Sequence, residues 1–366
     1  MRWNALQEGS TPQGALFERG AVARTFDTPG FRGMTFYEVH ARSIINQVPK
    51  ASRMAFRWTI NPYRGCGHAC VYCFARNTHT YLDLDAGQDF DSKIVVKVNA
   101  PELARRELAA PRWAGEHVAM GTNVDCYQRA EGRYQLMPGI IGALRDARNP
   151  FSILTKGTLI LRDLDLIADA AQVTDVGLNV SVGFVDKELS RLVEPGTPSP
   201  ARRLGICSAI AERGLSCGVL MGPVLPFLSD SPAQLEAAVR EIAAAGAARV
   251  TPIVLHLRPG TRDWFLRWLG ESVRNGSTGP ISTPQRSPRP VSAAQTASLR
   301  SGLGVPGSAD RESDLSTNPT ETLRPTSVTC AASASRSRSR RISVPLVRME
   351  NGLRASRSAP MIPGIS

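Results

Sequence analysis

Residues 66–73 read Cys66-Gly67-His68-Ala69-Cys70-Val71-Tyr72-Cys73, which places three cysteines at a C-x3-C-x2-C spacing. Thiolates are the protein ligands of iron–sulfur clusters, and a cubane normally takes four of them. Three thiolates on one short loop would leave one iron without a protein ligand and open to a substrate. The spacing therefore predicts a [4Fe–4S] cluster held by Cys66, Cys70 and Cys73.

Structural zinc is the alternative interpretation of these cysteines. Zinc sites close with four ligands, usually two C-x2-C pairs or one such pair with two histidines. The spacing here is unlike either, and no second pair of Cys or His follows in the sequence. His68 is a fourth ligand in principle, although it lies inside the tight loop.

The composition is that of a globular protein. Of the 366 residues, 42% are hydrophobic, and no run approaches the roughly 20 apolar residues of a membrane span. The first residues lack the apolar segment of a signal peptide. We therefore expect a cytoplasmic protein with no membrane span, in which crowded cysteines bind metal and do not form disulfides.

The basic charge is concentrated in a C-terminal tail. Residues 273–366 contain 13 Arg, no Lys and 5 acidic residues, so they hold +8 of the formal charge of +12. They also lack Phe, Trp, Tyr and His, which predicts a disordered tail because little apolar surface can be buried. One hypothesis is a shifted reading frame near Glu271, which an intact frame on resequencing would refute. The alternative is a tail that binds nucleic acid.

Residues 59–272 form the predicted core domain, where short apolar runs alternate with segments whose apolar residues recur three and four apart. Expected strands cover residues 56–60, 117–121, 151–154, 177–182, 216–221 and 249–256. Expected helices cover residues 100–110, 138–147, 163–171, 200–211 and 231–245. This α/β alternation predicts parallel strands in an open doubly wound sheet or a partial barrel, with the chemistry at their carboxyl ends. Residues 1–58 are expected to be a leader whose Phe36, Val39, Ile44 and Ile45 pack against the core.

Beyond its spacing, the cysteine segment resembles a known family. C-x3-C-x2-C with an aromatic residue before the last cysteine is similar to the signature of the radical S-adenosylmethionine (SAM) superfamily. Residues 61–76 resemble the subgroup related to spore photoproduct lyase, often described as DNA repair photolyase-like, and especially its uncharacterised actinobacterial branch. Residues 121–128, 153–156, 194–203 and 222–230 resemble further motifs of that subgroup, in the same order. Gly196 stands where the subgroup usually has Arg, which puts in doubt any ion pair that this Arg would make.

The resemblance implies a partial (β/α)6 radical SAM barrel with the cluster loop after the first strand. It also implies a [4Fe–4S] cluster and S-adenosyl-L-methionine as cofactors, with reductive cleavage to a 5′-deoxyadenosyl radical that abstracts a substrate hydrogen. An electron donor such as flavodoxin or ferredoxin would be a partner. The substrate is open, with a nucleic-acid lesion as one class. The alternative function is a non-catalytic metal-binding or nucleic-acid-binding protein with a basic tail.

The resemblance also implies roles for individual residues. The methionyl amine would lie near Gly121, Thr122, Asn123 and Asp125. Ser181 would meet the ribose, and the adenine would be bordered by Tyr72, Val224 and Leu225. Expected catalytic residues are Asp125, Lys156 and Cys126, of which Cys126 would donate a hydrogen atom to a product radical. A purely structural role is the alternative for four of these residues. Asp125 and Lys156 could each form a salt bridge, Tyr72 could pack the loop, and Cys126 could be an inert buried thiol.

Overall fold

The structure is a computed structural model that describes residues 20–52 and 54–274. The predicted disordered tail falls outside this range except for its first two positions, which form the end of helix α9 (Thr261–Arg274). Most of the tail, Cys330 included, therefore lies outside the described residues.

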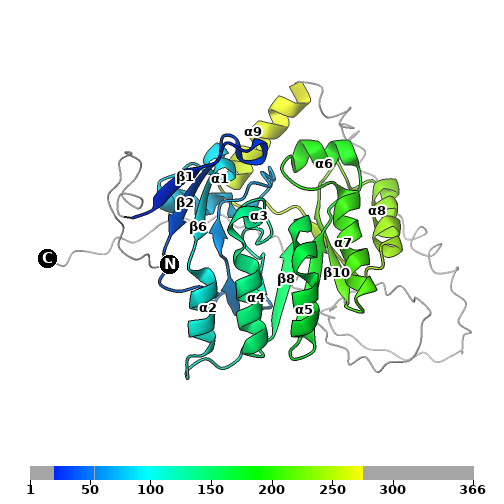
Figure 1. The fold of residues 1–366 in the computed structure, drawn as a ribbon. Coiled ribbons are helices and arrows are strands. Elements are labelled where there is room, and N and C mark those ends of the chain that lie inside the picture. Colours follow the sequence, from blue (N-terminus) through cyan, green and yellow to red (C-terminus); the bar gives the residue numbers. More distant parts are fainter. Residues whose placement is uncertain (1–19, 53, 275–366) are drawn as a thin grey trace, which may run out of the picture.

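A parallel sheet forms the centre of the fold (Figure 1). Its strands within the described residues are β4 (Trp58–Ile60), β7 (Val118–Met120), β8 (Phe151–Thr155), β9 (Val176–Ser181), β10 (Cys217–Val224) and β11 (Arg249–Val254). Each pairs in parallel with the next, and β3 (Ile45–Gln47) adds an antiparallel edge beside β4. All six strands predicted from the sequence are confirmed.

The predicted helices are also confirmed and lie on one side of this sheet (Figure 1). They are α2 (Ala100–Leu108), α4 (Leu136–Asp146), α5 (Leu164–Ala171), α7 (Pro200–Glu212) and α8 (Pro232–Ala244). Ser199 and Ser231 cap α7 and α8, each followed by a proline whose missing N–H suits the first helical turn.

The order of the strands decides between the two predicted architectures. From β4 to β11 the parallel strands follow chain order without a reversal. A doubly wound sheet needs such a reversal to place helices on both faces. The doubly wound alternative is therefore wrong, and the chain forms the α/β fold of a partial barrel whose sheet, in the described residues, ends at β3 and β11.

A smaller sheet, in the order β1-β2-β6-β5, takes two of its four strands, β1 and β2, from the segment expected to be a leader. Its strands are β1 (Val22–Thr25), β2 (Thr35–Val39), β5 (Tyr63–Arg64) and β6 (Lys93–Lys97). The predicted packing of Phe36, Val39, Ile44 and Ile45 is confirmed, because all four are buried. Strands β1 and β2 were not predicted, since the apolar residues of the expected leader are irregularly spaced, and β5 and β6 lie in a stretch to which no element was assigned.

The remaining elements are short. The helices are α1 (Gln88–Ser92), α3 (Glu131–Tyr134) and α6 (Lys187–Val193), and the 3-10 turns are η1 (Pro29–Phe31), η2 (Phe74–Thr78), η3 (Thr80–Leu82) and η4 (Thr158–Asp163). Among the described residues, no helix is long and apolar enough to cross a membrane.

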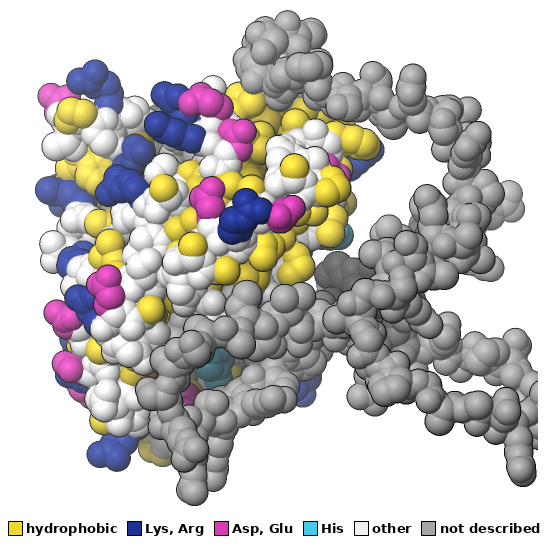
Figure 2. All heavy atoms as spheres, turned by 90° about the vertical axis from the view of Figure 1, so that its right-hand side faces the viewer, with side chains coloured by type: hydrophobic (Ala, Val, Ile, Leu, Met, Phe, Trp, Pro, Cys, Tyr) yellow, Lys and Arg dark blue, Asp and Glu magenta, His cyan; other side chains and the backbone are white. Residues whose placement is uncertain are grey.

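The outer edge of the barrel carries apolar side chains. Ile253 and Val254 of β11 are 43% and 68% exposed. Figure 2, which turns the right-hand side of Figure 1 toward the reader, shows apolar side chains gathered between charged ones on this side of the molecule. The sheet thus presents a partly apolar face where its described strands end.

A glycine allows the end of β7 to approach β8 closely. Gly121 has φ of +75°, and a Cβ at this position would collide with the carbonyl oxygen of Leu154. Since that oxygen belongs to the backbone of β8, it cannot move aside as a flexible side chain would. The segment that follows Gly121 is therefore held directly against the carboxyl end of the neighbouring strand.

We predict that Gly121→Ala lowers the free energy of unfolding by roughly 2 kcal/mol or more, because the new methyl group meets both strain and a backbone clash. Gly142→Ala is the matched control. Gly142 lies within α4, nothing lies within 4 Å of a Cβ built there, and alanine favours a helix. Urea unfolding of the two variants should show a loss for the first and no loss for the second; equal behaviour would contradict this account.

Candidate functional site

The three cysteines of the motif lie on one loop, residues 65–92, which we call the cluster loop. Its ends are joined by the antiparallel pairing of β5 with β6, where Tyr63 faces Val96 and Arg64 faces Val95. The loop leaves the carboxyl end of β4 through β5, so its cysteines lie at the end of the barrel where the chemistry was expected.

The cysteines have the properties of metal ligands. All three are free thiols, with Cys66 and Cys70 only 6% and 7% exposed and Cys73 partly buried. Burial raises the pKa of Cys70 to about 12 and also raises the pKa of Cys66 and Cys73. Buried thiols of this kind become thiolates when a cation binds them, because metal binding displaces the proton.

Zinc and a cubane differ in how thiolates bind them. A zinc ion takes all of its ligands at one atom. Each thiolate of a cubane binds a different iron, so three free thiols on one loop suit an iron–sulfur cluster with one iron left open.

Gln128 clamps the first turn of the cluster loop. Its Oε1 accepts a hydrogen bond from Gly67 N at 3.0 Å, and its Nε2 donates to the oxygen of Gly65 at 2.9 Å. The side chain is fully buried. Sequence reasoning assigned no role to Gln128, although it ends the motif at residues 121–128.

Asp125 ties the cluster loop to two strands of the barrel. Its carboxylate accepts hydrogen bonds from Tyr127 N (2.8 Å), Thr155 Oγ1 (2.7 Å) and Lys156 N (2.6 Å). His68 Nδ1 lies 3.4 Å from the second carboxylate oxygen. Burial lowers the pKa of His68, so the imidazole meets Asp125 as a neutral ring. The predicted residue Asp125 is thus occupied in positioning the loop.

Glu194 supports the far side of the loop. Tyr72 donates its hydroxyl hydrogen to Oε1, and Arg203 Nη2 donates to Oε2 at 2.6 Å. Lys156 Nζ lies 3.8 Å from Oε1 and 5.7 Å from the centre of the Tyr72 ring. Burial opposes ionisation of Glu194, but the charges of Arg203 and Lys156 prevail and lower its pKa. The carboxylate therefore stays charged, and the predicted residues Tyr72 and Lys156 meet on it.

Gly196 allows the segment that follows α6 to contact the backbone of the cluster loop. Its N–H donates to the oxygen of His68 at 3.0 Å, and a Cβ at this position would collide with the oxygen of Gly67. No side chain fits at this position, so an ion pair made from position 196 is absent from this structure. Glu194 of the same segment pairs with Arg203 of α7.

Arg76 holds the loop from within. Its Nε and Nη2 donate to the oxygen of Cys70 at 3.0 and 2.9 Å, and Nη2 also pairs with Asp91. The guanidinium lies 4.9 Å from the Trp264 ring of α9. Thr261, the first residue of this helix, donates to the oxygen of Cys73, and Asn77 donates to the oxygen of Pro259 just before it. Helix α9 therefore packs on the cluster loop, a role that its sequence did not reveal.

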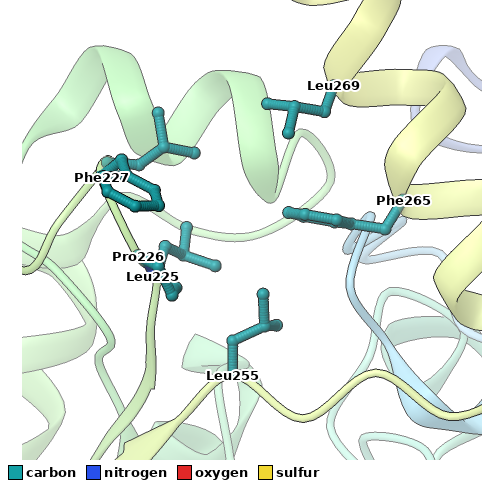
Figure 3. Close-up of a pocket in the computed structure, with 7 residues that line it drawn as sticks. Leu225, Pro226, Phe227, Leu255, Phe265 and Leu269 are labelled. Atoms are coloured by element: carbon teal, nitrogen blue, oxygen red, sulfur yellow. The ribbon is translucent and has the colours of Figure 1, made fainter. Parts of the chain in front are cut away.

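An apolar cavity of about 170 Å³ lies between the ends of β10 and β11 and helix α9 (Figure 3). It is lined by Leu225, Pro226, Phe227, Leu228, Leu255, Phe265 and Leu269. In Figure 3, Phe265 and Leu269 project from α9 toward the side chains of the opposite wall. Leu225 and Phe265 also belong to the buried cluster of apolar side chains that contains Cys70 and Tyr72. Predicted adenine neighbours Leu225 and Tyr72 thus pack in one group beside this cavity.

The other predicted residues are distributed around the strand ends. Gly121, Thr122 and Asn123 are partly exposed in the turn after β7, and Val224 ends β10. Ser181 ends β9, where its Oγ donates to the oxygen of Gly222 at 3.3 Å. Cys126 differs from these, because it is 1% exposed and packs in the main hydrophobic core. Its role as a hydrogen donor stays a prediction.

Comparison with known proteins agrees with this geometry. A family model described as the Radical SAM superfamily matches residues 60–246. A relative from Mycobacterium tuberculosis, itself named an uncharacterized protein, is 52% identical over 278 residues, 74% of this chain and 82% of that protein. Another from Methanocaldococcus jannaschii is 30% identical over 174 residues, 48% of this chain and 62% of that protein.

Among solved structures, spore photoproduct lyase complexed with dinucleoside spore photoproduct aligns with this chain. It shares 15% identity and a TM-score of 0.46, over 64% of this chain and 66% of that one. A likeness of this size carries no inference about the reaction.

We predict that Arg203→Ala destabilises the protein by about 3–5 kcal/mol, because it removes the buried cation that pairs with Oε2 of Glu194. Arg202→Ala is the matched control, since Arg202 is the preceding residue of α7 and its side chain is exposed. Removing that exposed arginine should change stability by no more than about 0.5 kcal/mol. Urea denaturation of both variants tests this, and similar losses in the two would refute the role of the ion pair.

Proposed function

Because the chain belongs to the radical SAM superfamily, we propose that it holds a [4Fe–4S] cluster on Cys66, Cys70 and Cys73 and cleaves S-adenosyl-L-methionine. When bound and reduced, that cluster supplies the electron that converts S-adenosylmethionine to methionine and a 5′-deoxyadenosyl radical. The observation that carries the proposal is the set of three free thiols on one loop, braced at the carboxyl ends of parallel strands.

The charges around the loop support this assignment. Lys156 and Arg203 act on Cys70, and Arg76 and Lys156 act on Cys73, in each case lowering the thiol pKa against the effect of burial. These cations would offset the negative charge of three thiolates. An electron donor of the flavodoxin or ferredoxin type is the reductant that we propose as a partner.

The apolar cavity supports a position for the adenine. We propose that the base enters between Leu225 and helix α9, beside Tyr72. The cavity of about 170 Å³ is lined by apolar side chains, which suit contact with the flat face of an aromatic base. The side chains of Leu255, Phe265 and Leu269 would exclude water from the base.

The remaining predicted residues retain their proposed places around S-adenosylmethionine. Gly121, Thr122 and Asn123 would face the methionyl amine, and Ser181 and Val224 would face the nucleoside. For the substrate, motif resemblance favours a nucleic-acid lesion, with Cys126 as the hydrogen donor to the product radical.

After anaerobic reconstitution we expect about four irons per chain, because a cubane contains four, and we expect 5′-deoxyadenosine to form when a reductant is added. Cys70→Ala should lose most of the iron and all product. Cys207→Ala, which removes a buried thiol outside the cluster loop, should keep the iron. Iron analysis and chromatography of the nucleoside provide the measurements, in reactions with and without ultraviolet-damaged DNA. A colourless protein that binds one zinc would overturn the proposal, and equal product in both reactions would argue against a DNA substrate.

Leu269→Trp should weaken the binding of S-adenosylmethionine at least tenfold, since the larger ring fills the space proposed for adenine. Leu266→Trp places the same ring on the same helix, but Leu266 is 45% exposed and does not line the cavity. Anaerobic titration of both reconstituted variants compares their dissociation constants. Unchanged binding by Leu269→Trp would place the base elsewhere.

A further inference from the structure

Two cysteines outside the cluster loop lie in contact with each other. Cys207 is in the middle of α7, and Cys217 is the first residue of β10. Their sulfur atoms are 2.8 Å apart, and both residues are buried, at 0% and 1% exposure. No pattern in the sequence connects a helix residue with a strand residue ten positions away.

We propose that Cys207 and Cys217 form a reversible disulfide and constitute a redox-modification site separate from the three cluster cysteines. A disulfide bond is about 2.05 Å long, so the two sulfurs need to approach by roughly 0.8 Å. The turn from α7 into β10 already holds them together, through a hydrogen bond from Leu215 N to the oxygen of Ile210 at 3.2 Å. Bond formation therefore needs little rearrangement of the backbone.

The two thiols differ in one contact. The Cys217 Sγ lies 3.6 Å from the oxygen of Gly218, an acceptor that favours the protonated thiol. In the proposed reaction Cys207 is therefore the thiol that attacks, and Cys217 is the thiol that resolves the product.

Hydrogen peroxide is the oxidant that this reaction requires, and its small, neutral molecule suits buried thiols. The Cys207 thiol loses its proton and its sulfur attacks one peroxide oxygen; the O–O bond breaks, a sulfenic acid forms, and the hydroxide that leaves takes up the released proton as water. The sulfur of Cys217 then attacks that of Cys207, the S–O bond breaks, and water leaves with the thiol proton. Two thiols are oxidised by two electrons and one peroxide is reduced to two waters. A small thiol reverses the change by exchange.

The disulfide would link α7 to β10 close to Arg203, which supports the cluster loop through Glu194. Arg203 lies four residues before Cys207, so both project from the same face of α7. Arg203 Nη1 donates to the oxygen of Ser181 and Nη2 pairs with Glu194. The disulfide would hold the helix that carries this arginine against the sheet.

Peptide mapping tests the proposal on the reconstituted protein. After brief exposure to peroxide, alkylation in denaturant and digestion with trypsin, cleavage at Arg213 separates residues 204–213 from residues 214–240. We expect these two peptides to be joined, with a mass about 2 Da below their sum, and to separate on reduction. The peptide with Cys126, a buried thiol of the same chain, serves as the internal control and should be recovered alkylated.

Recovery of both peptides unlinked, or of Cys207 as a sulfinic acid, would overturn the proposal. A thermal measurement gives a second, independent result. We expect the shift in melting temperature caused by peroxide to be about 5 °C more positive for the wild type than for Cys207→Ser. The reason is that only the wild type can form the disulfide, which restrains the unfolded chain. Loss of the cluster affects both proteins alike and cancels in this comparison. Cys217→Ser replaces Cys207→Ser if the latter does not fold, and an equal change in both proteins would refute the bond.

Discussion

The carboxylate of Asp125 joins three separate pieces of chain, and the geometry of the site depends on it. It accepts hydrogen bonds from its own turn and from the end of β8, and it meets His68 of the cluster loop. A carboxylate with this many partners in a poorly solvated position orients all of them together. The same strand ends that shape the barrel thereby fix the backbone between Cys66 and Cys70.

Opposite Asp125, a second buried carboxylate performs the corresponding task. Glu194 brings Tyr72, Lys156 and Arg203 to one point, and Gly196 lets the segment after α6 lie directly on the loop backbone. The two carboxylates act on different sides of the same loop. The hydrogen bonds and ion pairs of these two carboxylates order the loop, so the loop does not depend on a ligand for its conformation.

Much of this arrangement could be predicted from the sequence. Periodicity identified the strands and helices from residue 100 to residue 254, since each alternates or repeats over enough residues, and the cysteine spacing identified the cluster loop. Other features depend on partners far away in the chain. Nothing local in the sequence shows that Gln128 binds Gly65 and Gly67, that Trp264 packs on Arg76, or that Cys207 meets Cys217. Strands β1, β2 and β6 were also not predicted, because their conformation depends on the neighbouring strands of the sheet.

The small sheet has a consequence for the order in which the site is assembled. Strands β1, β2, β5 and β6 all lie between residues 22 and 97, so every partner in this sheet comes from one N-terminal segment. Gln128, Glu194 and Trp264 leave the ribosome after the whole of this segment. The strands that join the ends of the cluster loop are thus synthesised before the barrel residues that make its further contacts.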